Sequence, residues 1–304
     1  RSFDYIESGK TLLTPHTTSL LAAIHEAKGV KATDNDQTGY IGELVAVARI
    51  QSTDASNRIE GISTSDSRLN DLVSEKVTPR NRNEEEIAGY RDALSVIHES
   101  HDYIPITPNV ILQLHRDLFR HTPLTFAGHF KDSDNVIIER DAHGTSTVRF
   151  APPSALVTPE LIERACSAYT QAIRDGHTDP LLAIAMFILD FICIHPFNDA
   201  MPYESALTLL MLCRNGYMVG KYISIEHLIE QSKSTYYEAL AASTQGWDDN
   251  ANDYAPFTNY LLGIILSACK EFDERINLTA GGRAQGAPRV ATKERGLKHC
   301  LINP

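Results

Sequence analysis

The chain has 304 residues, 42% of them hydrophobic, which is enough apolar material for one large helical domain or two smaller ones. Its formal net charge of −11 excludes non-specific binding to nucleic acid or anionic membrane, because such partners require clustered Lys and Arg. No apolar stretch approaches the roughly 20 residues of a membrane span, and the N-terminus shows no secretion-signal pattern. We therefore expect a cytoplasmic protein whose five scattered cysteines are reduced.

Helical periodicity dominates the chain and predicts an all-α protein. Apolar residues recur at helical spacing over residues 16–28, 41–50, 84–100, 108–121, 159–175, 180–194, 205–215, 225–231, 234–244 and 254–276. Residues 51–83 are polar, and only a short segment around residues 56–62 is expected to form one or two helical turns.

Residues 128–151 interrupt the helical pattern. Two β-prone segments, at 135–138 and 147–150, flank a polar stretch that contains glycine. We predict one β-hairpin, which ends at Pro152 and Pro153 because proline cannot donate to a strand ladder.

These patterns divide the chain into four regions. We expect an N-terminal helical region at 1–83, a core at 84–220 that contains the hairpin, and C-terminal helices at 221–276. The tail at 277–304 shifts to Gly, Ala and Arg without a period, which predicts an irregular end.

The candidate chemistry lies directly after the apolar helix predicted at 180–194. There His195 leaves the helix, a Pro turn follows, and Asp199 stands four residues later. An imidazole held by the core and directed into a loop suits a general base, and the carboxylate could bridge Mg²⁺ to a phosphate. Taken alone, a histidine near a helix end is more often a hydrogen-bonded structural residue.

The segment from His195 to Asp199, HPFND, is similar to the opening of the Fic signature, HPFx[DE]GNGRxxR. Other segments resemble that family in the same order: EEEIAGYRDAL at 84–94, LHRDL at 114–118, FAPP at 150–153 and YYEAL at 236–240. The chain therefore resembles the Fic (Fido) family over roughly residues 40–276, which implies an all-helical fold with one β-hairpin flap.

The resemblance also implies an activity, that of a protein AMP transferase (adenylyltransferase). In the family, the signature His deprotonates a Ser, Thr or Tyr hydroxyl of a target protein, and that oxygen attacks the α-phosphate of ATP. His195 would be the base and Asp199 the ligand of the Mg²⁺ that accompanies ATP. ATP and a target protein are the implied partners, and homo-oligomerisation is left open.

Two further segments would complete such a site. The flap strand would pair with the target backbone by strand addition and contact the nucleotide through Asn135, Val136, Ile137 and Ile138. The resemblance places Tyr236 and Tyr237 on the nucleotide side of the pocket; ordinary helix packing is the alternative for both.

Residues 56–61, SNRIEG, fit the family's inhibitory pattern [ST]xxxE[GN]. They precede the core, as in the class whose inhibitory helix is N-terminal to the Fic domain. The resemblance implies that Ser56, Glu60 and Gly61 form this segment, and that Glu60 pairs with the second signature arginine and so misplaces ATP.

The signature fails after Asp199, within the motif at 195–206. Where the family has GNGRxxR, this chain has Ala200, Met201, Pro202, Tyr203, Glu204, Ser205 and Ala206. Cβ atoms and a proline then obstruct the backbone approach to phosphate, and no guanidinium remains. Glu60 accordingly has no arginine to pair with.

Two interpretations of this loop stay open. The chain is either a Fic scaffold that lost nucleotide chemistry and binds proteins, or an enzyme whose loop reflects three single-base losses in the gene or its reading. A DNA sequence that encodes the family-like GNGRMSRLLT can be written such that the loss of three single bases changes its translation to AMPYESALT. These are the residues found at 200–208. Removal of AMP, or transfer of another phosphate-linked group, is a narrower enzymatic alternative.

Overall fold

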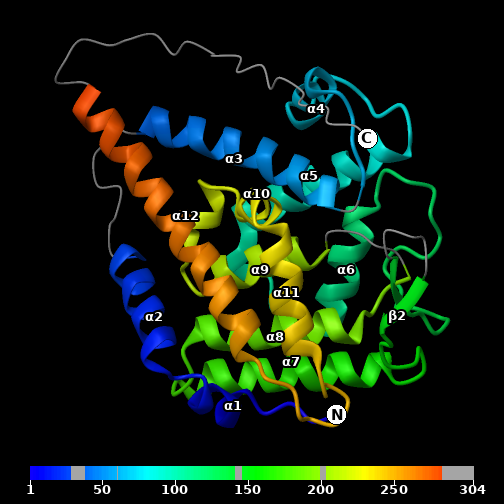
Figure 1. Ribbon diagram of the computed structural model, residues 1–304. Helices are drawn as coiled ribbons and strands as arrows, with labels where there is room; N and C mark the ends of the chain where they lie inside the picture. The colour runs from blue at the N-terminus through cyan, green and yellow to red at the C-terminus, as the bar shows by residue number, and fades with distance from the viewer. Residues whose placement is uncertain (29–37, 60, 141–145, 199–202, 283–304) are drawn as a thin grey trace, which may run out of the picture.

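A computed structural model describes residues 1–28, 38–59, 61–140, 146–198 and 203–282. In this part of the chain the helices are α1 (Tyr5–Thr11), α2 (Pro15–Lys28), α3 (Thr38–Ile59), α4 (Asp66–Val73), α5 (Arg82–Ser100), α6 (Pro108–Leu118), α7 (Thr158–Asp175), α8 (Pro180–Ile194), α9 (Tyr203–Arg214), α10 (Ile225–Gln231), α11 (Lys233–Thr244) and α12 (Ala255–Gly282). The strands β1 (Ile137–Arg140) and β2 (Ser146–Phe150) form the sheet. The fold is all-α with one hairpin, as predicted (Figure 1).

Helix α8 is the centre of the hydrophobic core. Apart from Asp190 it is apolar on every side, and all of its residues from Leu181 to Phe191 are buried, as expected of a helix without a polar face. Its start is specified locally, because the Asp179 carboxylate accepts the Leu181 N–H at 2.9 Å and Pro180 occupies the first turn. α7, α9, α11 and α12 pack around it (Figure 1).

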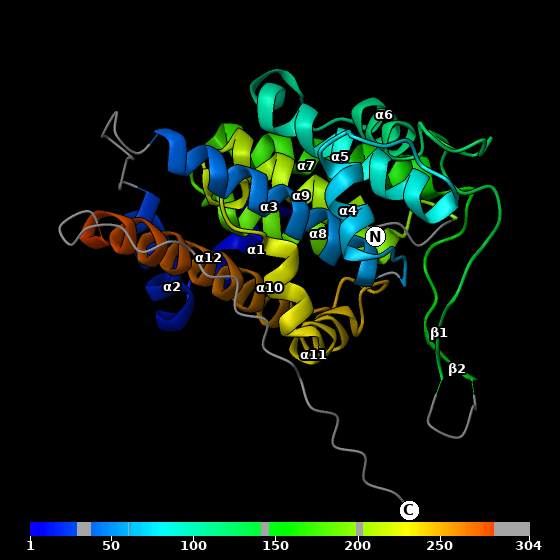
Figure 2. The same cartoon turned by 90° about the horizontal axis from the view of Figure 1, so that it is seen from above.

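The hairpin projects from one end of the helical body (Figure 2). β1 and β2 are antiparallel, and their register shifts between Ile137, which pairs with Phe150, and Ile138, which pairs with Val148. β1 begins two residues later than the predicted segment 135–138, and the Asn135 side chain contacts the loop after α8.

The N-terminal region contains more helix than the sequence predicts. α3 continues to Ile59 instead of ending near residue 50, and α4 lies within the segment expected to be mostly irregular. The helical turns expected around residues 56–62 are present as far as Ile59. The continuous helix through residues 51–55 is not predicted, because the buried side of this part of α3 is mostly polar: Ser52, Thr53, Ser56 and Asn57. α1 was missed because seven residues are too few to show a period.

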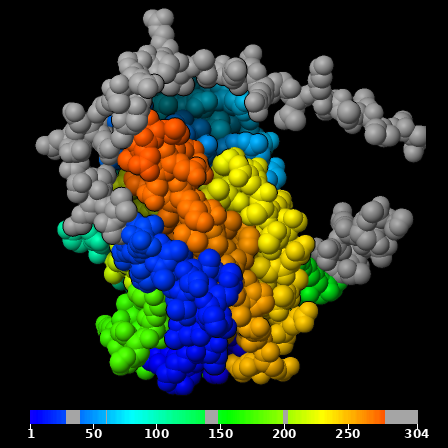
Figure 3. Space-filling view, turned by 60° about the vertical axis from the view of Figure 1, so that its left-hand side comes forward, coloured from blue at the N-terminus to red at the C-terminus, as the bar shows by residue number. Residues whose placement is uncertain are grey.

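The last helix, α12, extends to Gly282, so residues 277–282 are helical and not part of an irregular tail. α2 packs beside α12 on one face of the molecule (Figure 3). The larger hydrophobic core runs from Tyr5 in α1 to Cys269 in α12, and a smaller one lies between α4 and α5. No helix in the described ranges is long and apolar enough to cross a membrane.

Candidate functional site

His195 is held in a left-handed backbone conformation at the end of α8. Its φ is 46° and its ψ 66°, and its N–H donates to the Phe191 carbonyl at 3.0 Å. A non-glycine residue pays about 1–2 kcal/mol for this conformation, so it persists only where neighbouring contacts enforce it. The side chain lies at the wall of a cavity.

The ring of Phe197 fixes the loop that follows. It stacks on the buried His115 of α6, with 3.8 Å between ring centroids and parallel planes. The His115 ring is itself oriented, because its Nδ1 accepts the Gly128 N–H at 2.8 Å. α6 and the start of the flap segment therefore hold the signature phenylalanine.

The same loop is tied to the base of the flap. Asn135 donates from Nδ2 to the Phe197 carbonyl at 3.3 Å, and Asn198 donates from Nδ2 to Asp132 Oδ1 at 2.9 Å. The flap and the residues after α8 thus form one connected structure.

A cavity of about 220 Å³ opens between the flap, the end of α8 and α11. Its wall is mainly aromatic and aliphatic. The residues that line it are Ile59, Ile137, Arg149, Phe150, Phe191, Ile192, Cys193, His195, Pro196, Phe197, Tyr203, Glu204, Tyr236, Tyr237, Leu240, Ala241 and Thr244. His195, Ile137, Tyr236 and Tyr237, which the sequence places in one site, meet here. The cavity offers an imidazole beside an aromatic surface, an arrangement suited to a flat heterocycle.

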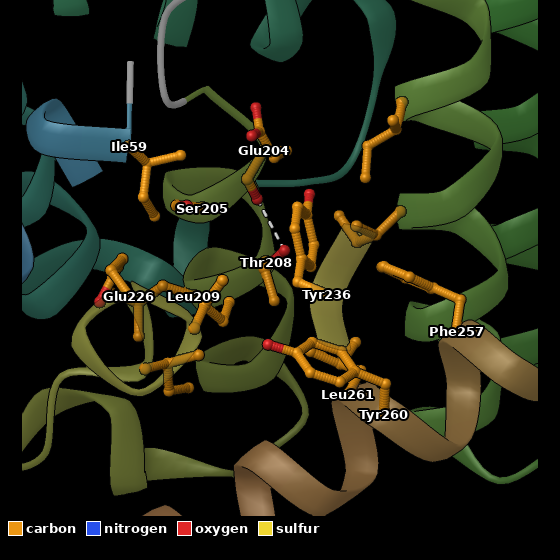
Figure 4. Close-up of a pocket in the computed structure, with 14 residues that line it drawn as sticks. Ile59, Glu204, Ser205, Thr208, Leu209, Glu226, Tyr236, Phe257, Tyr260 and Leu261 are labelled. Atoms are coloured by element: carbon orange, nitrogen blue, oxygen red, sulfur yellow. Dashed lines mark hydrogen bonds between the residues drawn. The ribbon is translucent and has the colours of Figure 1, made fainter. Parts of the chain in front are cut away.

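A narrower cavity of about 30 Å³ adjoins the first and shares Ile59, Ile192, Glu204 and Tyr236 with it. Figure 4 shows its wall, where the Thr208 hydroxyl donates to the Glu204 carbonyl at 2.6 Å. Burial raises the pKa of the Glu204 carboxyl to about 7, so this group changes charge near neutral pH.

Arg149 is the only cationic Lys or Arg side chain among the described residues that line the larger cavity. Its Nη2 donates to the Tyr237 carbonyl at 3.0 Å, and its guanidinium lies 5.4 Å from the centre of the Tyr237 ring. This contact joins β2 to α11 across the cavity. No local sequence pattern indicates this contact, since the partners are 88 positions apart.

Tyr236 has a role in packing as well as in the cavity wall. Its ring lies 5.4 Å from Tyr237, 6.4 Å from Phe257 and 5.7 Å from Tyr260, measured between centroids. Helix packing of Tyr236 is therefore observed, and its contact with a nucleotide stays a prediction. Tyr237 is more exposed, at 36%.

Other predicted flap and inhibitory residues lie outside the cavity wall. Asn135 is at the flap base, Val136 is 52% exposed, and Ser56 is fully buried in α3. Ile138 belongs to β1, but its side chain is outside the described set. Ile59, the last residue of α3, does line the cavity, so the helix carrying the predicted inhibitory segment ends at the site.

Gly61 has a structural reason to be glycine. Its φ is 80°, and its N–H donates to the Arg58 carbonyl at 3.0 Å while the Ile62 N–H donates to the Asn57 carbonyl at 2.9 Å. This is the usual glycine-terminated helix end, and it stops α3. The G of SNRIEG is thus explained by helix termination alone.

The degenerate motif is only partly described. Tyr203 is buried, donates its hydroxyl to the Ile111 carbonyl at 2.8 Å and lines the cavity, and Ala206 is fully buried in α9. Five predicted residues lie outside the described ranges: Glu60, Asp199, Ala200, Met201 and Pro202.

Within the described residues, no group of three or more His, Cys, Asp or Glu side chains is placed to hold a metal ion. The predicted Mg²⁺ ligand, Asp199, is not among them. The Mg²⁺ site therefore stays a prediction from the resemblance.

Comparisons with known proteins agree with this architecture. A model of the Fic/DOC family matches residues 105–200. Similar solved structures include a Fic family protein from Desulfovibrio desulfuricans G20, with TM-score 0.70 and 21% identity over 92% of this chain and 82% of that one. A Fic domain containing signaling protein from Bacteroides thetaiotaomicron VPI-5482 has TM-score 0.67 and 19% identity over 86% of this chain and 98% of that one.

Fic-1 from C. elegans is a third similar structure, with TM-score 0.63 and 17% identity over 87% of this chain and 72% of that one. At these identities the likeness establishes a shared fold. No curated protein matches the chain.

Proposed function

Because the chain is a Fic/Fido-domain protein, we propose that it is a transferase that moves AMP from ATP onto a Ser, Thr or Tyr hydroxyl of a target protein. One observation carries the proposal: His195 lines the same cavity as the flap residue Ile137 and the α11 residues Tyr236 and Tyr237. A base, a strand to present the target and an aromatic surface for the nucleotide are then adjacent.

In the proposed reaction the His195 imidazole accepts the hydroxyl proton of the target. The freed oxygen forms a bond to the α-phosphorus of ATP, the bond to the β-phosphate oxygen breaks, and pyrophosphate leaves. Tyr236 and Tyr237 would stack with or border the adenine. Mg²⁺, held by Asp199, would supply charge neutralisation for the phosphates.

We further propose that the end of α3 restrains this reaction. Ile59 lines both cavities, and its carbonyl is near Lys233 Nζ at 3.5 Å, so α3 ends at the site immediately before Glu60 in the sequence. If the gene encodes a signature arginine, Glu60 would pair with it and displace the γ-phosphate. Glu60→Gly would then raise self-modification.

A second function, that of a protein-binding Fic scaffold without nucleotide chemistry, is favoured by two described positions. Tyr203 and Ala206 stand where the signature has its arginines, and both are buried. Neither can neutralise a triphosphate. The flap would keep its role as a strand that pairs with a partner.

Resequencing the gene over codons 199–208, followed by calorimetric titration of the protein as expressed with Mg-ATP, tests the two proposals. The transferase requires saturable ATP binding and transfer of labelled AMP to protein, with transfer lost and binding kept in His195→Ala. The scaffold requires an unchanged loop sequence and no binding heat. Binding with no transfer in Glu60→Gly, with an intact signature confirmed, would contradict the transferase.

A further inference from the structure

One residue holds the backbone on both sides of His195. The Lys131 backbone N–H donates to the Pro196 carbonyl at 2.8 Å, and its Nζ donates to the Ile194 carbonyl at 3.1 Å. These acceptors are the carbonyl of the residue before His195 and the carbonyl of the residue after it. Ile194 also contributes one of the terminal carbonyls of α8, which have no partner within the helix.

Lys131 is itself fixed. The residue is only 4% exposed, and its Nζ also donates to Asn135 Oδ1 at 3.1 Å. The Asn135 amide then reaches the Phe197 carbonyl at 3.3 Å. Lys131 and Asn135 therefore attach the flap base to three consecutive features of the loop: the end of α8, the Pro turn and the signature phenylalanine.

Burying the Lys131 ammonium group at the end of α8 costs free energy. Burial lowers the pKa of Lys131 to about 8, against a smaller opposing effect of the nearby Asp134 carboxylate. A cation beside the last carbonyls of a helix is stabilised by hydrogen bonds and by the helix dipole, which offsets part of this cost. The left-handed conformation of His195 needs such enforcement, because it is unfavourable for a residue with a Cβ.

We propose that Lys131 is a positioning residue that keeps His195 in its left-handed conformation and directed into the cavity, and that it couples this geometry to the flap. The inference rests on the proposed function only for the role of His195 as the base. A lysine that merely capped α8 would stabilise the fold without controlling the local opening of His195.

The test compares two lysine-to-methionine variants. Lys131→Met removes the Nζ donors but keeps an unbranched side chain and the backbone N–H that binds Pro196. Lys221→Met is the matched control, because Lys221 Nζ donates to a main-chain carbonyl, that of His98 at 2.7 Å, away from the cavity. The first readout is hydrogen exchange of the His195 amide, resolved by NMR without nucleotide.

We expect exchange at His195 to become about tenfold faster or more in Lys131→Met, since a charge-assisted hydrogen bond that holds its neighbour is lost. Lys221→Met should leave it within about twofold of the wild type. With an active transferase, Lys131→Met should also lower kcat by about tenfold or more while KM changes by less than about threefold, because the base is displaced and the nucleotide surface is not.

Unchanged His195 exchange in Lys131→Met overturns the inference whatever the activity, and so does equal acceleration in both variants. If His195 exchanges faster in Lys131→Met but the wild-type protein never transfers AMP, the proposed function is overturned and the positioning role of Lys131 stands. If Lys131→Met does not fold, Asn135→Ala replaces it, with a smaller but selective acceleration at His195 expected. No acceleration there overturns the inference.

Discussion

Glu204→Gln tests the unusual charge environment at the start of α9. Burial raises the pKa of the Glu204 carboxyl from 4.5 to about 7, so between these values the folded protein holds a proton that the unfolded chain has lost. The contribution of this proton to the free energy of unfolding is fully present below pH 4.5 and is lost as the pH rises through the pKa of the folded state. The difference between the two pKa values corresponds to about 3 kcal/mol, as an upper value.

Glutamine has the same shape as glutamate and no charge. We therefore expect Glu204→Gln to match the wild type at pH 4.5 and to exceed its free energy of unfolding by about 1–3 kcal/mol at pH 8. Urea denaturation at both pH values measures this. Glu160→Gln is the control, because Glu160 is also in the first turn of a helix but is exposed. Parallel behaviour of Glu204→Gln and the wild type from pH 4.5 to 8 would refute the reasoning.

Three other substitutions test how the scaffold is held together. Gly89→Ala should lower the free energy of unfolding by about 3 kcal/mol in urea denaturation, because its Cβ would overlap the Leu118 carbonyl where α5 meets α6. Gly42→Ala, in open space on α3, should instead be neutral or stabilising by up to about 1 kcal/mol. Asp190→Ala should cost about 3–5 kcal/mol and lower the thermal midpoint by roughly 10 °C, because the buried Arg1 guanidinium, two tyrosine hydroxyls and an indole N–H lose their acceptor. An unchanged midpoint would show that this network does not stabilise the fold.

The central helix and its exit could be predicted because their signals are local. An apolar run between Asp179-Pro180 and His195-Pro196 has only one reasonable structure, a buried helix with a turn after it. The continuous course of α3 through residues 51–55 could not be read this way. It buries Ser52 and Ser56 against α5 and α10, where Ser52 donates to the Glu226 carboxylate at 2.7 Å, so hydrophobic periodicity has nothing to detect.

The cavity was predictable only where family motifs mark it. His195, Tyr236 and Tyr237 belong to recognisable segments, and the structure gathers them. Arg149 does not, because its place depends on the shift in register after Ile137: Phe150 pairs with Ile137 and Val148 with Ile138, which leaves Arg149 between them. Such irregularities redirect side chains near functional sites, and no single-sequence pattern specifies them.

Lys131 was missed for a related reason. A lysine in a polar segment is normally solvated, and only the packed structure shows its Nζ buried against the Ile194 carbonyl, 63 positions away. Long-range hydrogen bonds of this kind depend on tertiary packing, so composition and spacing carry no trace of them.

At the start of α9, the packing that stabilises the fold is independent of the residues that nucleotide binding would require. The core here is built by residues such as Tyr203, Ala206 and Leu207, whose packing against α5 and α8 does not depend on binding an anion. A triphosphate, by contrast, needs cations, and the described cavity wall offers Arg149 as its one guanidinium, already bonded to Tyr237. A scaffold that had lost the signature arginines would therefore keep the same helices, flap and cavity. The sequence of the loop and the heat of ATP binding are therefore the two observations that distinguish the transferase from the binding module.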